Sequence, residues 1–425
     1  MNITDGKGYD VVVCGSGSAG FCAAVQAARA GCKTAVIEKY GMSGGIMTVM
    51  GNNDVAQFYA YKKQVISGIG WEFITELNKR GFAHIPDMTV DAPHWKYGVR
   101  VNIPAAACLI DEMLISAGVD IYYNQAAVDV ETEESGNTDI PIKVKSVIIT
   151  TKSGLKRIDG KIFIDCTGDG DISVWAGAEY ECGDTDRALQ PGTIRYYFEN
   201  MSLNNAEVIM KNIQEAEKAG ELKPQDTFKR NITHLFNENG NNSNHISGYN
   251  GADSDSKTQA EIEGHKCVYR IMKILGDNLK ITTIAPEVAM RETRRIICDS
   301  YITADDYVNA KEYPDSICNS FYPIDLHRSG MGGIYQVFLT DGQVPKIPLS
   351  ALMVKGITNL YVAGRCASGD RLANSAYRVK ASCMAMGQAV GAAAAVSTKE
   401  NNGFTRGCSL VNIKKILIDN GASVP

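Results

Sequence analysis

The chain has 425 residues, 44% of them hydrophobic, which is enough to bury a large core and, at roughly 100–200 residues per domain, predicts two or three domains. Lys and Arg total 43 against 48 Asp and Glu, so the net charge of −5 gives no reason to expect binding to nucleic acid or to an anionic membrane. No stretch approaches the roughly 18–20 continuous apolar residues of a membrane helix, and residues 1–9 lack the pattern of a secretory signal. The twelve cysteines form no Cys-x-x-Cys pair and no ligand cluster, so we expect a cytoplasmic protein with free thiols and no metal centre.

A strand and a glycine-rich turn open the chain. Residues 9–14 read YDVVVC, and Gly15, Gly17 and Gly20 complete a Gly-x-Gly-x-x-Gly pattern at the start of an alanine-rich helix. Gly15 permits a sharp turn, Gly17 lets the backbone approach a pyrophosphate, and Gly20 lets the helix pack closely on the sheet. The N–H groups and positive dipole end of the helix would then face the phosphates. Although such turns also occur as ordinary loops, this context predicts a Rossmann-type dinucleotide site.

The second strand ends at Glu38. A carboxylate at this point can accept hydrogen bonds from a ribose 2′-hydroxyl, and it disfavours the 2′-phosphate of NADP.

Further along, apolar periodicity predicts a helix over residues 103–117, and later a helix over residues 375–396. Period-2 or continuous apolar patterns predict four strands, at residues 119–123, 127–130, 142–151 and 161–166. The polar passage Asn237 to Ser256 is interpreted as a mobile surface loop or lid, with a plain disordered insertion as the alternative.

Several motifs carry a resemblance to a known family. They are the first glycine turn with Ala24 and Gly31, the loop Lys39 to Gly45, the Thr167-Gly168-Asp169 turn, Arg291 to Arg295, Ile324 to His327, Val362 to Arg365, Tyr377 to Val379, and Cys383 to Gly391. From Tyr9 to about Ser397 the chain resembles the bacterial FAD-dependent oxidoreductase family of the Ala-Gly-Arg type, in the two-dinucleotide-binding-domain flavoprotein superfamily. In many FAD proteins the late strand ends in Gly-Asp, whose carboxylate binds the ribityl hydroxyls, whereas here Arg365 stands in that place.

The resemblance implies FAD as the cofactor and an α/β fold. It implies a Rossmann-like FAD-binding domain built from residues 1–60, 100–185 and 350–400, an inserted mixed α/β substrate domain from residues 61–99 and 186–349, and a C-terminal tail helix in 401–425. The residues expected to bind FAD are Gly15, Ser16, Gly17, Ser18, Ala19, Gly20, Glu38, Lys39, Ser43, Gly44, Gly45, Ile46, Met47, Ala127, Val128, Thr167, Gly168, Asp169, Gly364, Arg365, Ser375, Ala376 and Tyr377.

Three residues are candidates for catalysis. His327 could exchange a proton as hydride moves, with a structural role as the competing interpretation. Arg328 or Arg291 could anchor negative charge. Arg291, Arg294 and Arg295 would share one face if their segment were helical, which suits anion capture or an ordinary ion-paired surface.

Tyr377 and Arg378 are expected at the start of the last helix. The N-terminus of that helix could stabilise negative charge on the pyrimidine end of a reduced flavin.

The sequence therefore predicts an FAD-dependent oxidoreductase that transfers a hydride between flavin N5 and a small polar organic molecule. One alternative is a fumarate-reductase-like ene-reductase acting on a carboxylate-bearing alkene, and another is a flavin-binding protein with a sensing role. A disulfide reductase is disfavoured because no cysteine lies between Cys32 and Cys108. The partners expected are the substrate and an unidentified electron donor or acceptor, and a homo-oligomer is left open.

Overall fold

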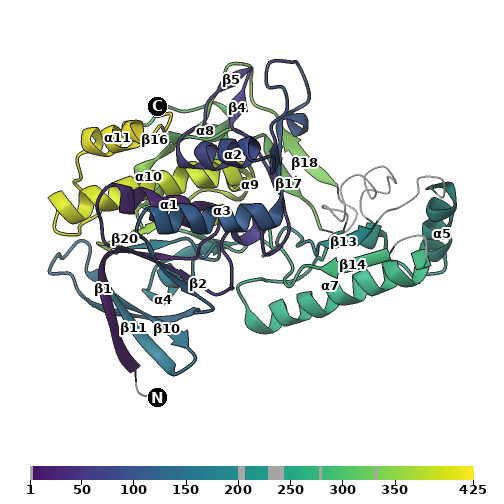
Figure 1. Ribbon diagram of the computed structural model, residues 1–425, viewed down its shortest axis with the longest axis horizontal. Coiled ribbons are helices and arrows are strands. Elements are labelled where there is room, and N and C mark those ends of the chain that lie inside the picture. The colour runs from purple at the N-terminus through teal and green to yellow at the C-terminus, as the bar shows by residue number, and fades with distance from the viewer. Residues whose placement is uncertain (1–2, 200–205, 228–243, 277–279, 330–332) are drawn as a thin grey trace.

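The computed structural model describes residues 3–199, 206–227, 244–276, 280–329 and 333–425. A seven-stranded sheet forms its centre, in the order β8-β2-β1-β11-β10-β9, with β20 paired to β11 (Figure 1). The strands are β1 (Ile3–Cys14), β2 (Thr34–Glu38), β8 (Asp120–Tyr123), β9 (Ala127–Glu134), β10 (Ile142–Thr151), β11 (Gly154–Asp165) and β20 (Leu360–Val362). The four strands predicted after the first βαβ unit are all present.

Strand β11 connects the parallel and the antiparallel parts of the sheet. It runs parallel to β1 on one side, while on the other side its first half pairs antiparallel with β10 and its last residues pair parallel with β20. Because β1, β2, β8, β11 and β20 are mutually parallel, their carboxyl ends meet at one edge of the sheet. The predicted α/β class with a Rossmann-like sheet is confirmed.

Alternate residues of β1 face two different cores. Val11 and Val13 pack with helices α1 (Ser18–Arg29), α2 (Ile69–Lys79), α3 (Ile103–Ser116) and α10 (Lys380–Glu400). Val12 and Cys14 pack on the opposite face with β9, β10, β20 and α4 (Asp171–Trp175). The sheet is therefore covered on both faces, which explains why its parallel strands read as continuous apolar runs.

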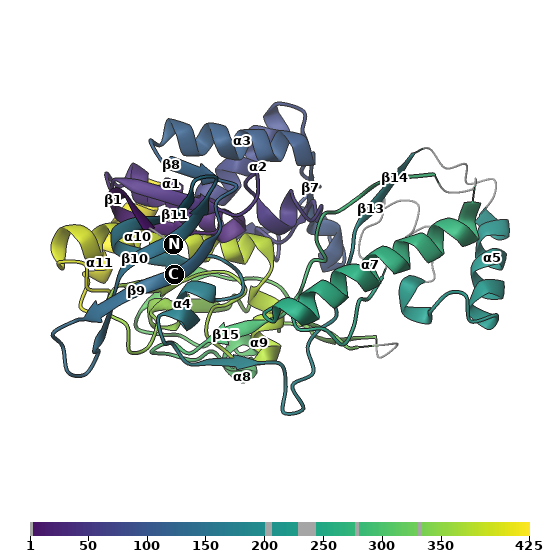
Figure 2. The ribbon, with the colours of Figure 1, turned by 90° about the horizontal axis from the view of Figure 1, so that it is seen from below.

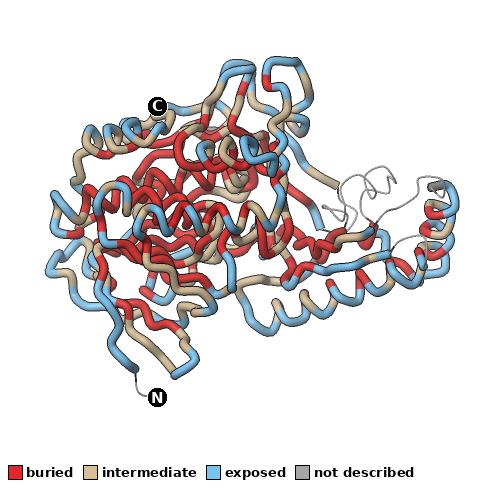
Figure 3. Tube along the Cα trace, in the orientation of Figure 1, coloured by how far each residue is buried: buried red, intermediate tan, exposed pale blue. Residues whose placement is uncertain are grey.

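Helices α1 and α10 pack against each other at very short range. A Cβ on Gly387 would lie 2.0 Å from the backbone oxygen of Ala19, and one on Gly391 would lie 2.5 Å from that of Ala23. Both helices are almost wholly buried, as Figure 3 shows by the red tube through the centre of the molecule. Small residues are thus required along this contact, which explains the alanine- and glycine-rich composition of both segments.

The single helix predicted over residues 375–396 is wrong. The structure has α9 (Arg371–Tyr377) and α10, bent by 90° relative to each other. Val379 between them is extended, at φ −67° and ψ 152°, and it ends the helical hydrogen bonding. Tyr377 and Arg378 therefore end α9, whereas the long helix begins at Lys380.

A third core lies in a part of the chain that projects from the sheet (Figures 1 and 2). It is built from β13 (Tyr196–Glu199), β14 (Lys280–Ile284), α5 (Ala206–Lys218) and α7 (Ser254–Leu275). Of the predicted loop or lid, residues 237–243 lie outside the described residues. Asn244, His245 and Ile246 contradict a surface loop because they are buried and bond to or pack on neighbouring segments. Residues 247–253 are irregular and partly or fully exposed, and α7 begins at Ser254.

The remaining elements are short and surround these layers. Helix α2 packs against α10 and α3, and α11 lies in the predicted C-terminal tail. The other helices and strands are α8 (Ala304–Val308), α11 (Leu410–Asp419), β3 (Asp54–Val55), β4 (Tyr59–Ala60), β5 (Lys63–Gln64), β6 (Ala83–His84), β7 (Val99–Val101), β12 (Tyr180–Cys182), β15 (Arg294–Ile296), β16 (Ser316–Asn319), β17 (Ile324–His327), β18 (Ile334–Val337) and β19 (Lys346–Pro348).

Within the described ranges, no single helix has the length and apolar character to cross a membrane, and only the bent pair α9 and α10 meets that test when its two helices are taken together.

Candidate functional site

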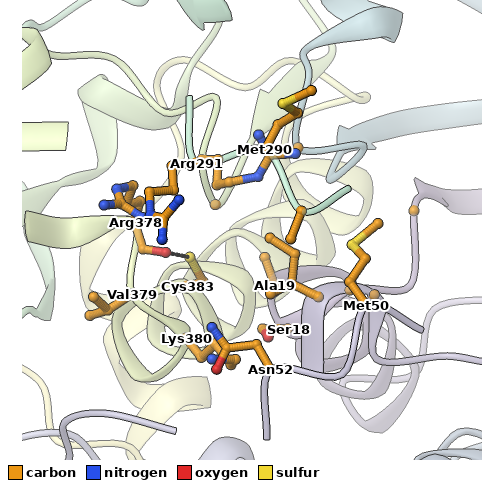
Figure 4. A pocket seen from close by; sticks show the side chains of 18 of the residues that line it. Ser18, Ala19, Met50, Asn52, Met290, Arg291, Arg378, Val379, Lys380 and Cys383 are labelled. Atoms are coloured by element: carbon orange, nitrogen blue, oxygen red, sulfur yellow. Dashed lines mark hydrogen bonds between the residues drawn. The ribbon is translucent and has the colours of Figure 1, made fainter. Parts of the chain in front are cut away.

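A cavity of about 870 Å³ lies at the carboxyl edge of the parallel strands. It is lined by the glycine turn after β1, by the ends of β2, β11 and β20, and by the start of α10. This is the edge at which doubly wound sheets bind their ligands, and the volume falls within the roughly 300–1,000 Å³ of small-molecule sites. Figure 4 shows part of its lining, including Ser18 and Ala19 from α1 and Arg378, Val379 and Lys380 from the break between α9 and α10.

The glycine turn leaves room for a ligand at its second glycine. A Cβ built on Gly17 would meet no protein atom within 4 Å, whereas one on Gly20 would lie 1.8 Å from the backbone oxygen of Gly15. Helix α1 has no side-chain cap at Gly17 and no acidic residue in its first turn. Its first N–H groups are thus available to an anion, as a pyrophosphate requires.

Glu38 is buried beside this turn. Its carboxylate accepts hydrogen bonds from the backbone N–H groups of Ser16, at 2.8 Å, and Tyr40, at 3.0 Å. Burial raises the pKa of Glu38 to about 7, although the hydrogen bond from Ser16 and the charge of Lys39 act in the opposite direction. The carboxylate faces the cavity and ties the glycine turn to the end of β2.

Arg365 pairs with a carboxylate from the neighbouring strand. Its Nη2 lies 2.9 Å from Oδ1 of Asp169, which also accepts a hydrogen bond from Thr293 at 2.8 Å. Burial alone would raise the pKa of Asp169, but Arg365 and Thr293 outweigh it and the pKa is lowered. The two segments that end β11 and β20 thus place an ionised carboxylate at the cavity wall.

Sixteen of the predicted site residues line the cavity. They are Gly15, Gly17, Ser18, Ala19, Glu38, Lys39, Gly45, Ile46, Ala127, Thr167, Gly168, Asp169, Arg291, His327, Gly364 and Arg365. The residues that do not line it are Ser16, Gly20, Ser43, Gly44, Met47, Val128, Arg328, Ser375, Ala376 and Tyr377.

Several residues of this second group support the wall from behind. Ser16 and Ser43 share a hydrogen bond between their hydroxyls at 2.6 Å, and the N–H of Gly44 bonds to the backbone oxygen of Ser16. The hydroxyl of Ser375 accepts a hydrogen bond from the N–H of Asp325. Arg328 is exposed, with its guanidinium over the ring of Tyr335, and this position does not suit an anchor inside the cavity.

His327 stands in a buried row of polar side chains. Its Nε2 lies 3.3 Å from Oδ2 of Asp325, and its Nδ1 lies 3.1 Å from Nε2 of His245. A carboxylate can only accept, so Asp325 favours the tautomer of His327 with the proton on Nε2, which makes Nδ1 the acceptor toward His245. Burial and the charge of Arg291 lower the pKa of His327 to about 3 against the opposing effect of Asp325, so the ring is neutral at pH 7.

The arginines of residues 291–295 do not share a helix face, contrary to prediction. Arg294 and Arg295 belong to strand β15, which pairs with β12, so their side chains point in different directions. Arg294 pairs with Asp171, whereas Arg295 forms a buried ion pair with Glu292 at 2.8 Å. Only Arg291 lines the cavity.

Several other polar residues of the wall were not predicted. Arg195, Lys380, His94 and Tyr322 line the cavity, and His245 lies behind His327. Only Lys380 had a local indication, since it directly follows the Tyr377-Arg378-Val379 motif. The others come from segments with no recognisable pattern.

Within the described ranges no group of three or more His, Cys, Asp or Glu side chains could hold a metal ion. All twelve cysteines are free, as predicted, and most of them are buried.

Comparison with known proteins gives a family for the chain. The model of the family described as FAD dependent oxidoreductase matches residues 10–416. Among solved structures, p-nitrophenol 4-monooxygenase of Pseudomonas putida is 12% identical, with 99% of this chain and 84% of that chain covered and a TM-score of 0.45. A geranylgeranyl bacteriochlorophyll reductase-like protein of Thermoplasma acidophilum is 13% identical, with 98% and 84% covered and a TM-score of 0.42.

Proposed function

The chain belongs to the family of FAD-dependent oxidoreductases, and we propose that it transfers a hydride between N5 of FAD and a small polar organic substrate. The observation that carries this proposal is the cavity itself, whose wall contains both the glycine turn of a dinucleotide site and the polar group of Arg291, Asp325 and His327. Because both groups of residues line one cavity, a substrate could be held beside the bound cofactor. Bound FAD supplies the redox chemistry, so the protein has to position the substrate and handle protons and charge.

The residues at the sheet edge fit FAD. We assign the pyrophosphate to the N–H groups at Gly17 and Ser18, where a side chain is absent and the helix dipole is positive. Glu38 would accept from the adenosine ribose. Asp169, held by Arg365, would take the place of the Gly-Asp carboxylate that many FAD proteins have after the late strand.

At the other end of the cavity, His327 would donate or accept a proton, and Arg291 would stabilise negative charge on the substrate. His327 keeps one proton on Nε2 against Asp325, and its Nδ1 exchanges with His245. A proton could therefore move along the row of Asp325, His327 and His245. No imidazolium without a hydrogen-bond partner has to form during this transfer. Arg291 faces the same space, and its positive charge disfavours the imidazolium form of His327 until an anion is bound.

The test is an anaerobic screen of the purified holoprotein against a metabolite library, in which flavin absorbance reports reduction or reoxidation. We expect at least one small polar metabolite to bleach or restore the flavin band. With that metabolite, His327→Gln should slow flavin reduction by ~10² or more while FAD stays bound. His265→Gln, on the exposed face of α7, is the matched control and should leave the rate unchanged. An unchanged rate in His327→Gln would remove that residue from the mechanism.

A further inference from the structure

Four basic side chains gather at one end of the cavity, each from a different segment. Arg195 precedes β13, Arg291 precedes β15, Arg378 follows α9, and Lys380 begins α10. We call this group the basic end. Figure 4 shows Arg291, Arg378 and Lys380 among the side chains that line it.

These four groups are close enough to repel one another. Burial lowers the pKa of Arg291 to about 9, and the charges of Arg378 and Arg195 act in the same direction. Burial likewise lowers the pKa of Lys380 to about 7, with Arg195 and Arg378 again adding to the effect. Like charges at such range destabilise the protein unless negative charge is present among them.

Three described carboxylates act on the charges of the basic end. Asp325 offsets Arg291 and Arg378, Glu292 also acts on Arg378, and Asp54 offsets Lys380. Asp325 is also shared with His327 and with Gln336, whose Nε2 donates to it at 3.1 Å. Glu292 is itself held by Arg295 and Arg371, so these carboxylates are shared among several partners. At the other end of the cavity, Lys39, Lys257 and Arg365 each form an ion pair with Glu287 or Asp169.

Arg378 has hydrogen-bonding capacity left over. Its Nη2 donates to Oε1 of Gln190, at 3.3 Å, and to the backbone oxygen of Asp325, at 3.2 Å, both of which are neutral acceptors. Its Nε is buried and has no partner among the described residues. A buried guanidinium N–H without an acceptor is costly, so a ligand acceptor is expected beside it.

The position of Lys380 also favours a bound anion at the basic end. It is the first residue of the 21-residue helix α10, whose N-cap, Val379, makes no side-chain cap bond. A cation at a helix N-terminus opposes the helix dipole, and its Nζ is bonded only to the neutral backbone oxygen of Asp54 among the hydrogen bonds of the described residues. An anion at this end would be stabilised by the lysine and by the helix together.

We propose that the basic end binds a carboxylate of the substrate, so that the enzyme acts on a small organic acid. The inference rests on the proposed function, in which this end of the cavity receives the substrate. A planar guanidinium fork matches a carboxylate in a bidentate manner, and Arg291 and Arg378 supply two such forks. The rings of His94 and Tyr322, 5.3 Å apart and nearly perpendicular, form an adjoining wall for the body of the acid. Lys96 and Arg100, both exposed, add positive charge to the lining and favour the entry of an anion.

The test measures binding of matched acids and amides to the FAD-loaded protein by calorimetry and by flavin difference absorbance. The probes are acetate, benzoate and succinate, each paired with its neutral amide, and inorganic phosphate. We expect at least one carboxylate to bind ten-fold or more tightly than its amide. Equal binding of every acid and amide, no binding of either, or binding of phosphate without any carboxylate would overturn the proposal.

Variants locate the site. Arg378→Gln should weaken the carboxylate by about 10- to 100-fold while the amide is unaffected, and Arg378→Lys, which keeps the charge without the fork, should recover part of the loss. Arg80→Gln, which removes a surface arginine paired with Glu76 and Glu112, should change nothing. If Arg378→Gln does not fold, the same binding measurement is made on Arg291→Gln. A folded variant that binds the carboxylate as tightly as the wild type would overturn the proposal. A wild-type protein that takes up no FAD would instead contradict the proposed function, and carboxylate binding to it by calorimetry would still support the basic end.

Discussion

Arg365 and Asp169 form an ion pair of 2.9 Å across the carboxyl ends of two parallel strands, although 196 residues separate them in the chain. Arg365 stands where many FAD proteins have the aspartate of Gly-Asp. We propose that the carboxylate of Asp169, which Arg365 holds, serves FAD in its place.

Asp169→Asn should therefore lower the affinity for FAD. The amide loses the charge that offsets Arg365, and charge-assisted hydrogen bonds contribute roughly 1.5–3 kcal/mol, which corresponds to about a 10- to 100-fold loss. Thr293→Val removes one hydrogen bond to the same carboxylate but keeps both charges, so its effect should be several-fold smaller. Titration of apoprotein with FAD, followed by flavin fluorescence, measures both. Equal affinities for wild type and Asp169→Asn would show that this carboxylate does not contact the cofactor.

The glycine turn offers a pair of substitutions with opposite consequences. Gly17→Ala adds a methyl group to open space at φ −72°, so the apoprotein should keep its stability and lose FAD affinity by ten-fold or more. Gly20→Ala forces a Cβ against the backbone of Gly15, and such overpacking costs roughly 1–3 kcal/mol of folding free energy. Urea unfolding of both apoproteins and FAD titration separate the two effects. Retained FAD affinity in Gly17→Ala would place the pyrophosphate elsewhere.

Glu38 should make the stability of the apoprotein depend on pH. Burial raises its pKa from 4.5 to about 7, so the folded state binds a proton that the unfolded state releases. The stabilisation is complete below pH 4.5 and is lost as the pH rises through 7, by roughly 3 kcal/mol in total. Glu38→Gln should show a flatter profile over this window, as measured by urea unfolding at fixed pH values. Parallel profiles for the two proteins would contradict a buried, protonated Glu38.

The buried ion pair of Glu292 should matter more for stability than exposed pairs. Its carboxylate contacts Arg295 at 2.8 Å and Arg371 at 2.9 Å and is almost wholly buried. Glu292→Gln removes the buried charge that both guanidinium groups share and leaves them only their more exposed partners, Glu181 and Asp184. Breaking a buried pair costs about 3–5 kcal/mol. Glu112→Gln, which breaks an exposed pair with Arg80, should have a much smaller effect because solvent screens that pair. Similar losses in denaturant unfolding would show that the Glu292 pair is not buried in solution.

The parts of the fold that were predictable depend on local patterns. The first βαβ unit, the strands that follow it and the strand before Thr167 all have periodicity and turn residues within a few positions of one another. Such signals arise from backbone geometry, which neighbouring residues largely determine. The same signals predicted many of the residues that line the cavity.

The rest depended on partners distant in sequence. The spacing of Arg291, Arg294 and Arg295 matches a helix, but pairing with β12, more than 110 residues earlier, makes the segment a strand. The contact of His245 with His327 spans 82 residues, and no local pattern marks His245. The 90° break before Lys380 arises from an extended valine, a conformation that the apolar periodicity on both sides did not indicate.

A structure of the holoprotein with FAD tests the central claim most directly. We expect the pyrophosphate within hydrogen-bond distance of the N–H groups at Gly17 and Ser18, the adenosine ribose at Glu38, and the isoalloxazine ring between the glycine turn and Arg291, with N5 open to His327. A pyrophosphate bound away from the turn, or a ring held on the far side of β20 from His327, would contradict the account.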